Sequence, residues 1–415
     1  MTTGIHQHDV IIIGAGMVGA SFACALTRPA VSGQAVPRVL LVESAPIALD
    51  GVPRQPGFDS RSTVLSASSR DVLQQLGLWD ALAPEVAPIS EIVVSDQGRF
   101  GSVRMSADEQ KIPALGYVVE NGLLGQRFNQ ALLQSSSFRL RASTQVKGLK
   151  PVPGGMQVML EGSDEVLSAS LVVLAEGGRS SLTTQLGIEQ RVDSYSQSAV
   201  IANMAHALPH EGRAFERFTP KGPLAFLPLP DFEGEHRSAL VWTQPLAQAE
   251  TVLELPEHEF LARLQADFGH TLGRLTKVGK RALFPLALTV ASEQIRPSLA
   301  LLGNVAHTLH PVAGQGFNLA LRDAMALAQQ VRGAIAADES AGSFTRLQQY
   351  HAQVAQDQST TIAFSHYLVS LFSSNRAGAG LARQLAMAGL DHLSPLRRLL
   401  AQQAMGYRSP RVDLA

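Results

Sequence analysis

The sequence predicts an α/β protein in which a discontinuous domain built on a parallel sheet is interrupted by a mixed β-sheet domain and followed by a helical region. Three separate segments, within residues 8–27, 171–182 and 299–336, join a short apolar run to a glycine-containing turn. Residues 186–290 instead hold strand-like runs such as PLAFLPLP and SALVWT, broken by Pro, Gly and charged turns. From about residue 336 the spacing of apolar residues is helical.

The composition is that of a globular protein and argues against several classes of function. A chain of 415 residues is long for one core, and a prior of roughly 150 residues per domain predicts two or three domains. The 34 basic residues nearly balance the 35 acidic ones, so no surface for nucleic acid is indicated. The single cysteine, Cys24, excludes an intramolecular disulfide framework and fits a reducing compartment.

The first residues, MTTGIHQHDV, lack the basic start and apolar core of a secretory signal peptide. The sequence also has no apolar run as long as the roughly 18 residues that span a bilayer. We therefore expect a cytoplasmic protein, with any contact at the inner membrane being peripheral.

The first glycine pattern predicts a Rossmann-like dinucleotide-binding turn. In HDVIIIGAGMVGASFACALT an apolar strand at 10–13 leads through Gly14, Gly16 and Gly19 into a helix. The first glycine permits the turn, the second lets the backbone approach a pyrophosphate, and the third lets helix and strand pack closely. A second apolar run, RVLLVES, ends in Glu43, where a carboxylate accepts hydrogen bonds from an adenosine ribose. An acid there disfavours a 2′-phosphate, so FAD or NAD is predicted.

A second cofactor loop is predicted near residue 300, which favours FAD over NAD. There a strand at 299–302 passes Gly303 and Asn304 and a Pro/Gly-rich loop before a helix begins near Phe317. Gly314 and Gly316 leave the loop backbone without side chains, so a flat ring can approach it. The helix N-terminus offers unpaired N–H groups and a positive dipole end, which suits the negatively charged edge of a reduced flavin.

These patterns resemble the flavoprotein aromatic hydroxylases of the para-hydroxybenzoate hydroxylase fold, and the resemblance covers nearly the whole chain. After its late strand that family has Gly-Asp-Ala-Ala-His, then His-Pro and a Gly-Gln-Gly-x-Asn loop. A further family element, Asp-Gly, stands here as Glu176 and Gly177 in LVVLAEGGRSSL. The late-loop positions hold Gly303 to His307, then His310 and Pro311, then Gly314, Gln315, Gly316, Phe317 and Asn318.

The resemblance implies a division of the chain. Residues 1–75, 115–185 and 286–335 form a discontinuous FAD-binding domain, 76–114 and 186–285 an inserted substrate domain, and 336–415 a C-terminal helical region. On the substrate sheet Phe226, Leu240 or Trp242 can wall a pocket for an aromatic ring with an isoprenoid tail. The alternative, that these are ordinary core residues, stays open.

Two further segments are closest to the ubiquinone-biosynthesis branch, and within it to the 2-polyprenyl-6-methoxyphenol hydroxylases. They are FDSRSTVLSASSRDVLQQLGLWDAL at 58–82 and VIANMAHALPHEGRAFERFTPKGPLAFLPLP at 200–230. The resemblance implies that Arg61 lies near the flavin or its pyrophosphate and that Arg127 contacts the pyrophosphate. For Arg61 a solvated charge is the alternative.

Two residues depart from the family pattern. Asn304 stands where aspartate is common, and its amide oxygen can accept a hydrogen bond from the flavin ribityl chain without charge assistance. Glu176 is one methylene longer than the usual aspartate, which puts its partner and the route of the nicotinamide donor in question.

The resemblance implies hydroxylation of a polyprenylated methoxyphenol ring in ubiquinone biosynthesis. NADH or NADPH reduces FAD, O₂ is captured as a C4a-hydroperoxide, and one oxygen is transferred to the ring, while the protein orients the cofactor and excludes water. A sister hydroxylase acting at another ring carbon, an FAD-linked oxidase or dehydrogenase, and a catalytically silent flavin-binding subunit of a ubiquinone-biosynthesis complex are the alternatives.

The histidines of the late loop have separate predicted roles. His307 is interpreted as a structural hydrogen-bonding residue. His310 and Pro311 lie, in the family, beside the reactive face of the flavin and are the candidate catalytic residues, with His310 as a general base on the phenol. No metal site is predicted, because these histidines lack companion Cys or Glu residues at ligand spacing.

The C-terminal region contains an amphipathic stripe, formed by Phe364, Tyr367, Leu368, Leu371 and Phe372. Further on, LSPLRRLLAQQAMGYR mixes leucines with arginines. One hypothesis is that this region packs on the flavin domain or a partner subunit, and the other is that it docks on the membrane that supplies a polyprenyl substrate.

Overall fold

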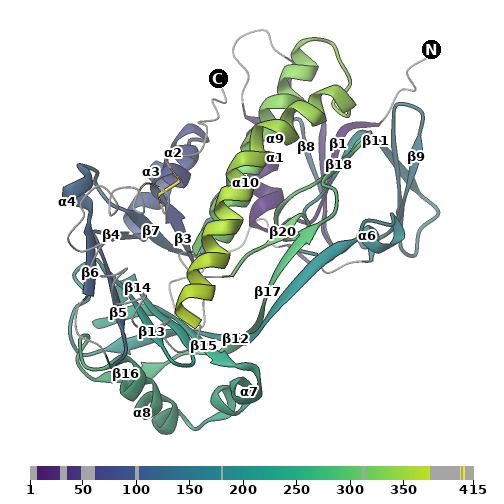
Figure 1. Ribbon diagram of the computed structural model, residues 1–415. Helices are drawn as coiled ribbons and strands as arrows, with labels where there is room; N and C mark the ends of the chain where they lie inside the picture. Colours follow the sequence, from purple (N-terminus) through teal and green to yellow (C-terminus); the bar gives the residue numbers. More distant parts are fainter. Residues whose placement is uncertain are drawn as a thin grey trace.

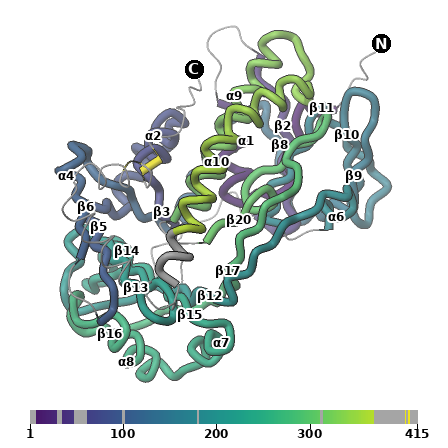
Figure 2. The backbone as a smooth tube through the Cα atoms, in the orientation of Figure 1, coloured from purple at the N-terminus to yellow at the C-terminus, as the bar shows by residue number. Residues whose placement is uncertain are grey.

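The computed structural model describes residues 7–28, 35–47, 61–98, 102–178, 181–310 and 314–373, together with residues 402, 405 and 406. Its described strands form an eight-stranded, a nine-stranded and a three-stranded sheet. The two large sheets lie at opposite ends of the molecule (Figure 1). Two long strands, β12 (Gln190–His206) and β17 (Ala282–Ala291), run between these ends, as the backbone tube of Figure 2 also shows. This is the α/β architecture that the sequence predicts.

The eight-stranded sheet carries the predicted cofactor loops. Its main path is β18-β19-β11-β1-β2-β8, and β1 pairs in parallel with both β11 and β2, while β11 pairs in parallel with β19. Successive residues of β1 point to opposite sides, so that Ile12 joins the core beneath the helices and Ile11 joins the core on the other face. Both faces are covered, which explains why the central strand β2 (VLLV) and the strand β19 (LAL) are apolar throughout. The strands are β1 (His8–Ile13), β2 (Val39–Val42), β8 (Phe138–Arg141), β9 (Val146–Val152), β10 (Gly155–Leu160), β11 (Val166–Leu174), β18 (Ile295–Arg296) and β19 (Leu299–Leu301).

Helices α1 (Met17–Thr27), α5 (Asn121–Leu133) and α9 (Gln315–Ala336) cover one face of this sheet (Figure 1). The thiol of Cys24 lies between α1 and α5, where it donates to the carbonyl of Phe128 at 3.6 Å. Burial raises the pKa of this thiol to about 12, which makes it an inert packing group.

The nine-stranded sheet is mainly antiparallel and has the order β20-β17-β12-β15-β14-β13-β5-β6, with β16 beside β12. One face is covered by α7 (Leu246–Glu254) and α8 (Glu257–Phe268), and Phe226, Leu240 and Trp242 are fully buried in the core on that side. They are therefore ordinary core residues, which is the alternative to a pocket wall given for them from the sequence. The other strands are β5 (Glu91–Asp96), β6 (Ser102–Ser106), β13 (Arg213–Thr219), β14 (Gly222–Phe232), β15 (Glu235–Pro245), β16 (Leu275–Val278) and β20 (His307–Thr308).

A small sheet, β3-β7-β4, connects the two large ones. Val64 of β3 and Val118 of β7 pack in one cluster with Ala214 and Ala239 of the nine-stranded sheet. The small sheet consists of β3 (Ser62–Ser66), β4 (Ala87–Ile89) and β7 (Gly116–Glu120), and the short helices nearby are α2 (Ala67–Gln75), α3 (Trp79–Leu82), η1 (Ala83–Glu85) and α4 (Ala107–Gln110).

The C-terminal helix α10 (Phe344–Ser373) packs along α9 and reaches toward the nine-stranded sheet (Figure 1). A buried ion pair joins the two helices, with 2.7 Å between Arg322 Nε and Asp357 Oδ2. On the predicted stripe, Tyr367 is 71% exposed, while the side chains of 368–372 and the LSPLRRLL segment lie outside the described residues. None of the described helices combines the length and apolar content needed to cross a bilayer.

Candidate functional site

The glycine-containing loops meet at one edge of the eight-stranded sheet. Because β1, β11 and β19 are parallel neighbours, their carboxyl ends share this edge. Gly14 has a φ of +105°, and a Cβ placed there would lie 2.6 Å from the carbonyl oxygen of Ala175. A Cβ placed at Gly178 would lie 3.5 Å from the carbonyl oxygen of Asn304. Three motifs that are far apart in the sequence are therefore adjacent in the structure.

The first turn gives each predicted glycine a distinct environment. A Cβ at Gly19 would lie only 2.0 Å from the carbonyl oxygen of Gly14, so this position permits no side chain. Gly16 precedes α1 in an extended conformation, and apart from its chain neighbours no atom of the described residues lies within 4 Å of a Cβ placed there. The turn is thus closed by Gly14 and Gly19 and open at Gly16.

Glu43 follows β2 and lies against this turn. Its Oε2 accepts a hydrogen bond from the backbone N–H of Ala15 at 2.7 Å, and its Oε1 accepts one from the N–H of Ala45 at 2.9 Å. The half-buried carboxylate is therefore held at the mouth of the glycine turn, where the sequence places it.

The late loop ends at the N-terminus of α9, which begins at Gln315 rather than at Phe317. Gly314 precedes it with a φ of +61°, and a Cβ there would lie 2.8 Å from Cβ of Val64. Within the described chain no side chain caps this helix end. Apart from the chain neighbours and the backbone of α9 itself, no described atom comes within 4 Å of a Cβ placed at Gly316. The first turn of α9 at Gly316 therefore carries no side chain and is not crowded by the described residues around it. Pro311 lies outside the described residues.

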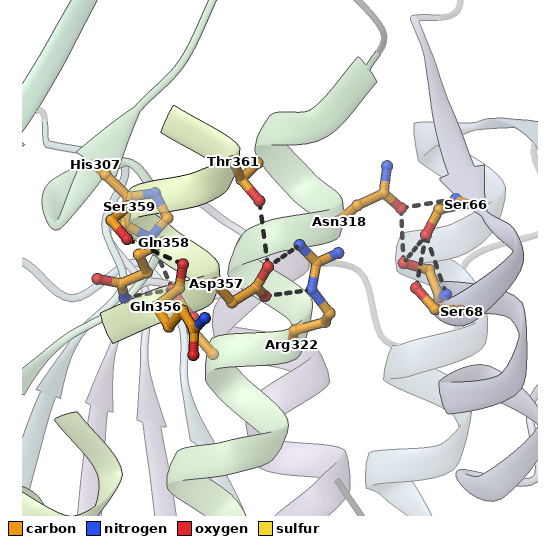
Figure 3. Close-up of polar contacts among 12 residues, drawn as sticks. Ser66, Ser68, His307, Asn318, Arg322, Gln356, Asp357, Gln358, Ser359 and Thr361 are labelled. Atoms are coloured by element: carbon orange, nitrogen blue, oxygen red, sulfur yellow. Dashed lines mark hydrogen bonds and ion pairs between the residues drawn. The ribbon is translucent and has the colours of Figure 1, made fainter. Parts of the chain in front are cut away.

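Asn318 binds the late loop to the small sheet (Figure 3). Its side-chain oxygen accepts hydrogen bonds from the N–H of Ser66 at 2.8 Å and from the hydroxyl of Ser69 at 2.6 Å. Its amide nitrogen donates to the carbonyls of Val64 at 2.8 Å and Gly314 at 2.7 Å. These contacts occupy the amide completely, so the side chain of Asn318 positions the loop and only its backbone is available to a cofactor.

Asn304 and Glu176 lie on the loops that meet beside the first turn. Asn304 is exposed in the short helix η2 (Gly303–Val305), and its carbonyl accepts a hydrogen bond from the hydroxyl of Thr308 at 3.1 Å. Cα of Glu176 lies 2.7 Å from a Cβ placed at Gly14. The neighbouring Gly177 has a φ of +77°, and apart from its chain neighbours no described atom lies within 4 Å of its Cβ position.

The two predicted arginines have partners within the protein. The guanidinium carbon of Arg61 lies 5.6 Å from the ring centroid of Phe284 on β17, although Arg61 itself is exposed. Arg127 Nη2 lies 2.5 Å from Glu85 Oε1. To contact a pyrophosphate, the guanidinium of Arg127 has to leave Glu85 or bind both groups at once.

His307 is a buried hydrogen-bonding residue, in line with its structural interpretation. Its Nε2 lies 2.7 Å from Oδ2 of Asp323 on α9, and both side chains are at most 2% exposed. The same Oδ2 accepts a hydrogen bond from Gln358 of α10 at 2.9 Å. The contact ties the strand that precedes the late loop to both C-terminal helices.

His310 is also buried, and its ring centroid lies 5.2 Å from that of Tyr195 in an edge-to-face contact. Burial lowers the pKa of His310 to about 4, so its imidazole is neutral near pH 7. A base with so low a pKa is poorly matched to a phenol proton. The pKa of His310 therefore weighs against the general-base role expected from the sequence.

Comparison with known proteins identifies the group to which this site belongs. The family model of the FAD binding domain matches residues 7–365. The ubiquinone hydroxylase UbiL of Rhodospirillum rubrum is 36% identical over 399 residues, which cover 96% of this chain and 89% of that protein. The chain belongs to the FAD-binding hydroxylases of ubiquinone biosynthesis. It is an FAD-dependent monooxygenase.

Other relatives agree with this assignment. The 3-demethoxyubiquinol 3-hydroxylase of Escherichia coli is 31% identical to the hydroxylase over 398 residues, covering 96% of this chain and 98% of its own. The crystal structure of p-nitrophenol 4-monooxygenase from Pseudomonas putida superposes with a TM-score of 0.76 at 17% identity, covering 97% of this chain and 98% of its own. At that identity the structural likeness shows the fold alone.

The residues of the hydroxylase fit an FAD. Gly16, Gly177 and Gly316 come from different loops at one sheet edge, and apart from their own chain neighbours and local helix backbone no described atom lies within 4 Å of a Cβ at any of them. The glycine turn at the start of α1 suits a pyrophosphate, and the uncapped start of α9 suits an electron-rich ring edge. Among the described residues no group of three or more His, Cys, Asp or Glu side chains is arranged to hold a metal ion.

Several residues that shape this site were not singled out from the sequence. Asp323 and Gln358 hold His307, and Ser69 holds Asn318. Asp323 follows the predicted loop closely in LALRD, and a carboxylate at that place in a buried helix is a signal that could have found it. Gln358 carries no comparable signal, because it is an unremarkable position in a long polar helix.

Proposed function

We propose that this hydroxylase adds oxygen to the ring of a 2-polyprenyl-6-methoxyphenol, with NADH or NADPH as electron donor and O₂ as oxidant. The meeting of the loops around Gly14, Gly177 and Asn304 at one sheet edge carries the proposal, because it builds a seat for FAD beside the nine-stranded sheet. The ring position rests on the likeness of residues 58–82 and 200–230 to that subgroup.

Within this proposal the first turn and Glu43 hold the adenosine half of the cofactor. The N–H groups that follow Gly16, at the start of α1, face the pyrophosphate. Arg127 contacts the pyrophosphate either by leaving Glu85 or by binding both groups. The Glu43 carboxylate, which accepts from Ala15 N–H through Oε2, has lone pairs left for the ribose hydroxyls. Arg61 lies at the flavin end, over Phe284.

The second and third loops hold the flavin half. Glu176 and Gly177 lie beside the pyrophosphate and the donor route, and the amide oxygen of Asn304 accepts from the ribityl chain. N–H groups of Gln315, Gly316 and Phe317 donate to the electron-rich edge of the ring. When bound, FAD supplies the redox and oxygen-activating chemistry; the protein orients the cofactor and excludes water.

A second candidate is hydroxylation at another ring carbon. It is favoured by the 31% identity to the 3-demethoxyubiquinol 3-hydroxylase, which covers 98% of that protein. The FAD site is the same in both cases, so the substrate has to be identified directly.

Deletion of the gene in its host, followed by mass spectrometry of quinone precursors, separates the two candidates. We expect 2-polyprenyl-6-methoxyphenol to accumulate and a plasmid copy of the gene to remove it. Accumulation of a demethoxyubiquinol instead would support the second candidate and overturn the first.

A further inference from the structure

The nine-stranded sheet has two unlike faces. On the face under α7 and α8, Val200, Leu224 and Trp242 are fully buried. The residues that alternate with them, such as Ile201 and Val241, remain partly exposed. The small sheet covers part of this second face, where it packs on Ala214 and Ala239. Apolar side chains in the middle of a sheet are usually covered, so the part around Ile201 and Val241 that the described residues leave partly exposed is available to a ligand.

This second face is directed toward the cofactor loops. Val64, which contacts the Gly314 position, packs in one cluster with Ala214 and Ala239 of this face. At another point of the same face, Arg61 lies over Phe284. A phenol bound between the sheet and the seat for the flavin ring would therefore contact this surface.

One acidic residue, Glu216, stands on this second face and is half-buried there. It lies on β13 between Ala214 and Phe218, and its register partners are Val94 on β5 and Ala225 on β14. The row continues across the sheet through Val241, Ile201 and Ala282. Every other member of the row is apolar.

The other charged groups on this side of the sheet are set apart from Glu216. Asp96 is on the same face of β5 but opposite Phe218, in the next row. Arg237 of β15 is buried and paired with Glu120 of β7 at 3.2 Å. Arg61 is at the far edge, and α10, which also approaches β14, has no acidic or basic residue in its last turns, YLVSLFS.

The apolar surroundings change the acidity of this carboxyl group. Burial raises the pKa of Glu216 to about 8. A phenol has a pKa of about 10, so a carboxylate of this basicity is a far better proton acceptor for it than an ordinary glutamate. Near neutral pH a minority of the molecules therefore carries Glu216 as the carboxylate that can accept a proton.

We propose that Glu216 is a catalytic residue that accepts the hydroxyl proton of the phenol substrate, an inference that rests on the proposed function. The phenol O–H bond breaks, its electron pair stays on the phenolate oxygen, and the proton moves to a carboxylate oxygen of Glu216. Overall, phenol, O₂, NAD(P)H and a proton give the hydroxylated phenol, water and NAD(P)⁺. Ionisation makes the ring more electron-rich at the carbon that receives oxygen.

The test compares wild-type holoenzyme with Glu216→Gln, which keeps the shape of the side chain but cannot accept the proton. We expect wild-type hydroxylation to rise with pH through about 8, and Glu216→Gln to lose this inflection and roughly 100-fold of the rate. NAD(P)H oxidation should continue in the variant with release of peroxide. Glu211→Gln, at an exposed site just before β13, is the matched control and should behave as wild type.

A fluorinated phenol that is already ionised at the assay pH separates a chemical role from a structural one. It needs no base, so it should restore most of the hydroxylation in Glu216→Gln. Equal loss with both phenols, or a wild-type pH profile in Glu216→Gln, would overturn the assignment. If wild-type enzyme itself fails to hydroxylate either phenol, the proposed function fails instead.

In case Glu216→Gln does not bind FAD, the wild-type holoenzyme provides an independent readout. The ultraviolet spectrum of the bound phenol should show the phenolate band growing as the pH rises through about 8, below the ordinary phenol pKa of about 10. A bound phenol that ionises only near its solution pKa would contradict the role of Glu216.

Discussion

Buried polar residues around the late loop hold backbone in place, and most of them do not face the cofactor site. Asn318 uses its whole amide on Ser66, Ser69, Val64 and Gly314, and His307 is fixed by Asp323. Leaving one such partner unsatisfied costs about 1–3 kcal/mol. At the scale of single residues, the site is therefore a rigid frame whose chemistry is left to backbone N–H groups and the cofactor.

His310 makes a prediction about stability. The pKa of His310 falls from 6.5 to about 4 in the folded protein. The unfolded chain therefore takes up this proton at a higher pH than the folded chain, and stability present above pH 6.5 is lost as the pH falls toward 4. Burial lowers the pKa of His206 to about 4 as well, so it adds to the same window.

Chemical denaturation between pH 7 and 4 measures this loss, which we expect to be up to about 3 kcal/mol for each histidine. His310→Gln should flatten the dependence, whereas His258→Gln, at an 83% exposed side chain, should not change it. An unchanged slope in His310→Gln would show that this histidine titrates alike in the folded and unfolded states.

The strand–turn–helix units are the elements on which cofactor binding depends. In β1 and α1, Gly14 and Gly19 are required by the protein itself, since a Cβ at Gly19 would lie 2.0 Å from a backbone oxygen. Gly16 is different, because its extended backbone, with φ −62° and ψ 176°, accepts any residue. Its lack of a side chain therefore serves the ligand.

Gly16→Val should separate folding from cofactor binding. We expect the unfolding free energy of the apoprotein to change by no more than about 0.5 kcal/mol, while the affinity for FAD falls at least about tenfold. Denaturation of the apoprotein and a fluorescence titration with FAD measure the two effects. Wild-type FAD affinity in Gly16→Val would mean that the pyrophosphate does not pass over this turn.

At the scale of the whole molecule, the sequence predicted the parts that depend on local pattern. The Gly14 turn, the position of Glu43 and the strand before Asn304 follow from spacing within a few dozen residues. Contacts over long separations did not follow, such as Asn318 with Ser66, because no local signal names the partner.

The covered face of the nine-stranded sheet could likewise not be predicted from local sequence pattern. Alternation indicates that Trp242 and Val241 point to opposite faces, but only the packing of α7 and α8 shows which face is covered. Glu216 was not singled out for that reason, since a lone glutamate in a strand is usually a solvent-facing residue.

The most direct test of the account is the stoichiometry of the reaction. Holoenzyme is given NAD(P)H, O₂ and a short-chain prenylated methoxyphenol, and NAD(P)H oxidised, peroxide formed and hydroxylated product are measured together. We predict that the phenol stimulates NAD(P)H oxidation and that product forms nearly one for one with it, with little peroxide. If NAD(P)H were oxidised at the same rate without the phenol, and all the oxygen consumed appeared as peroxide, the assignment as a phenol hydroxylase would be contradicted.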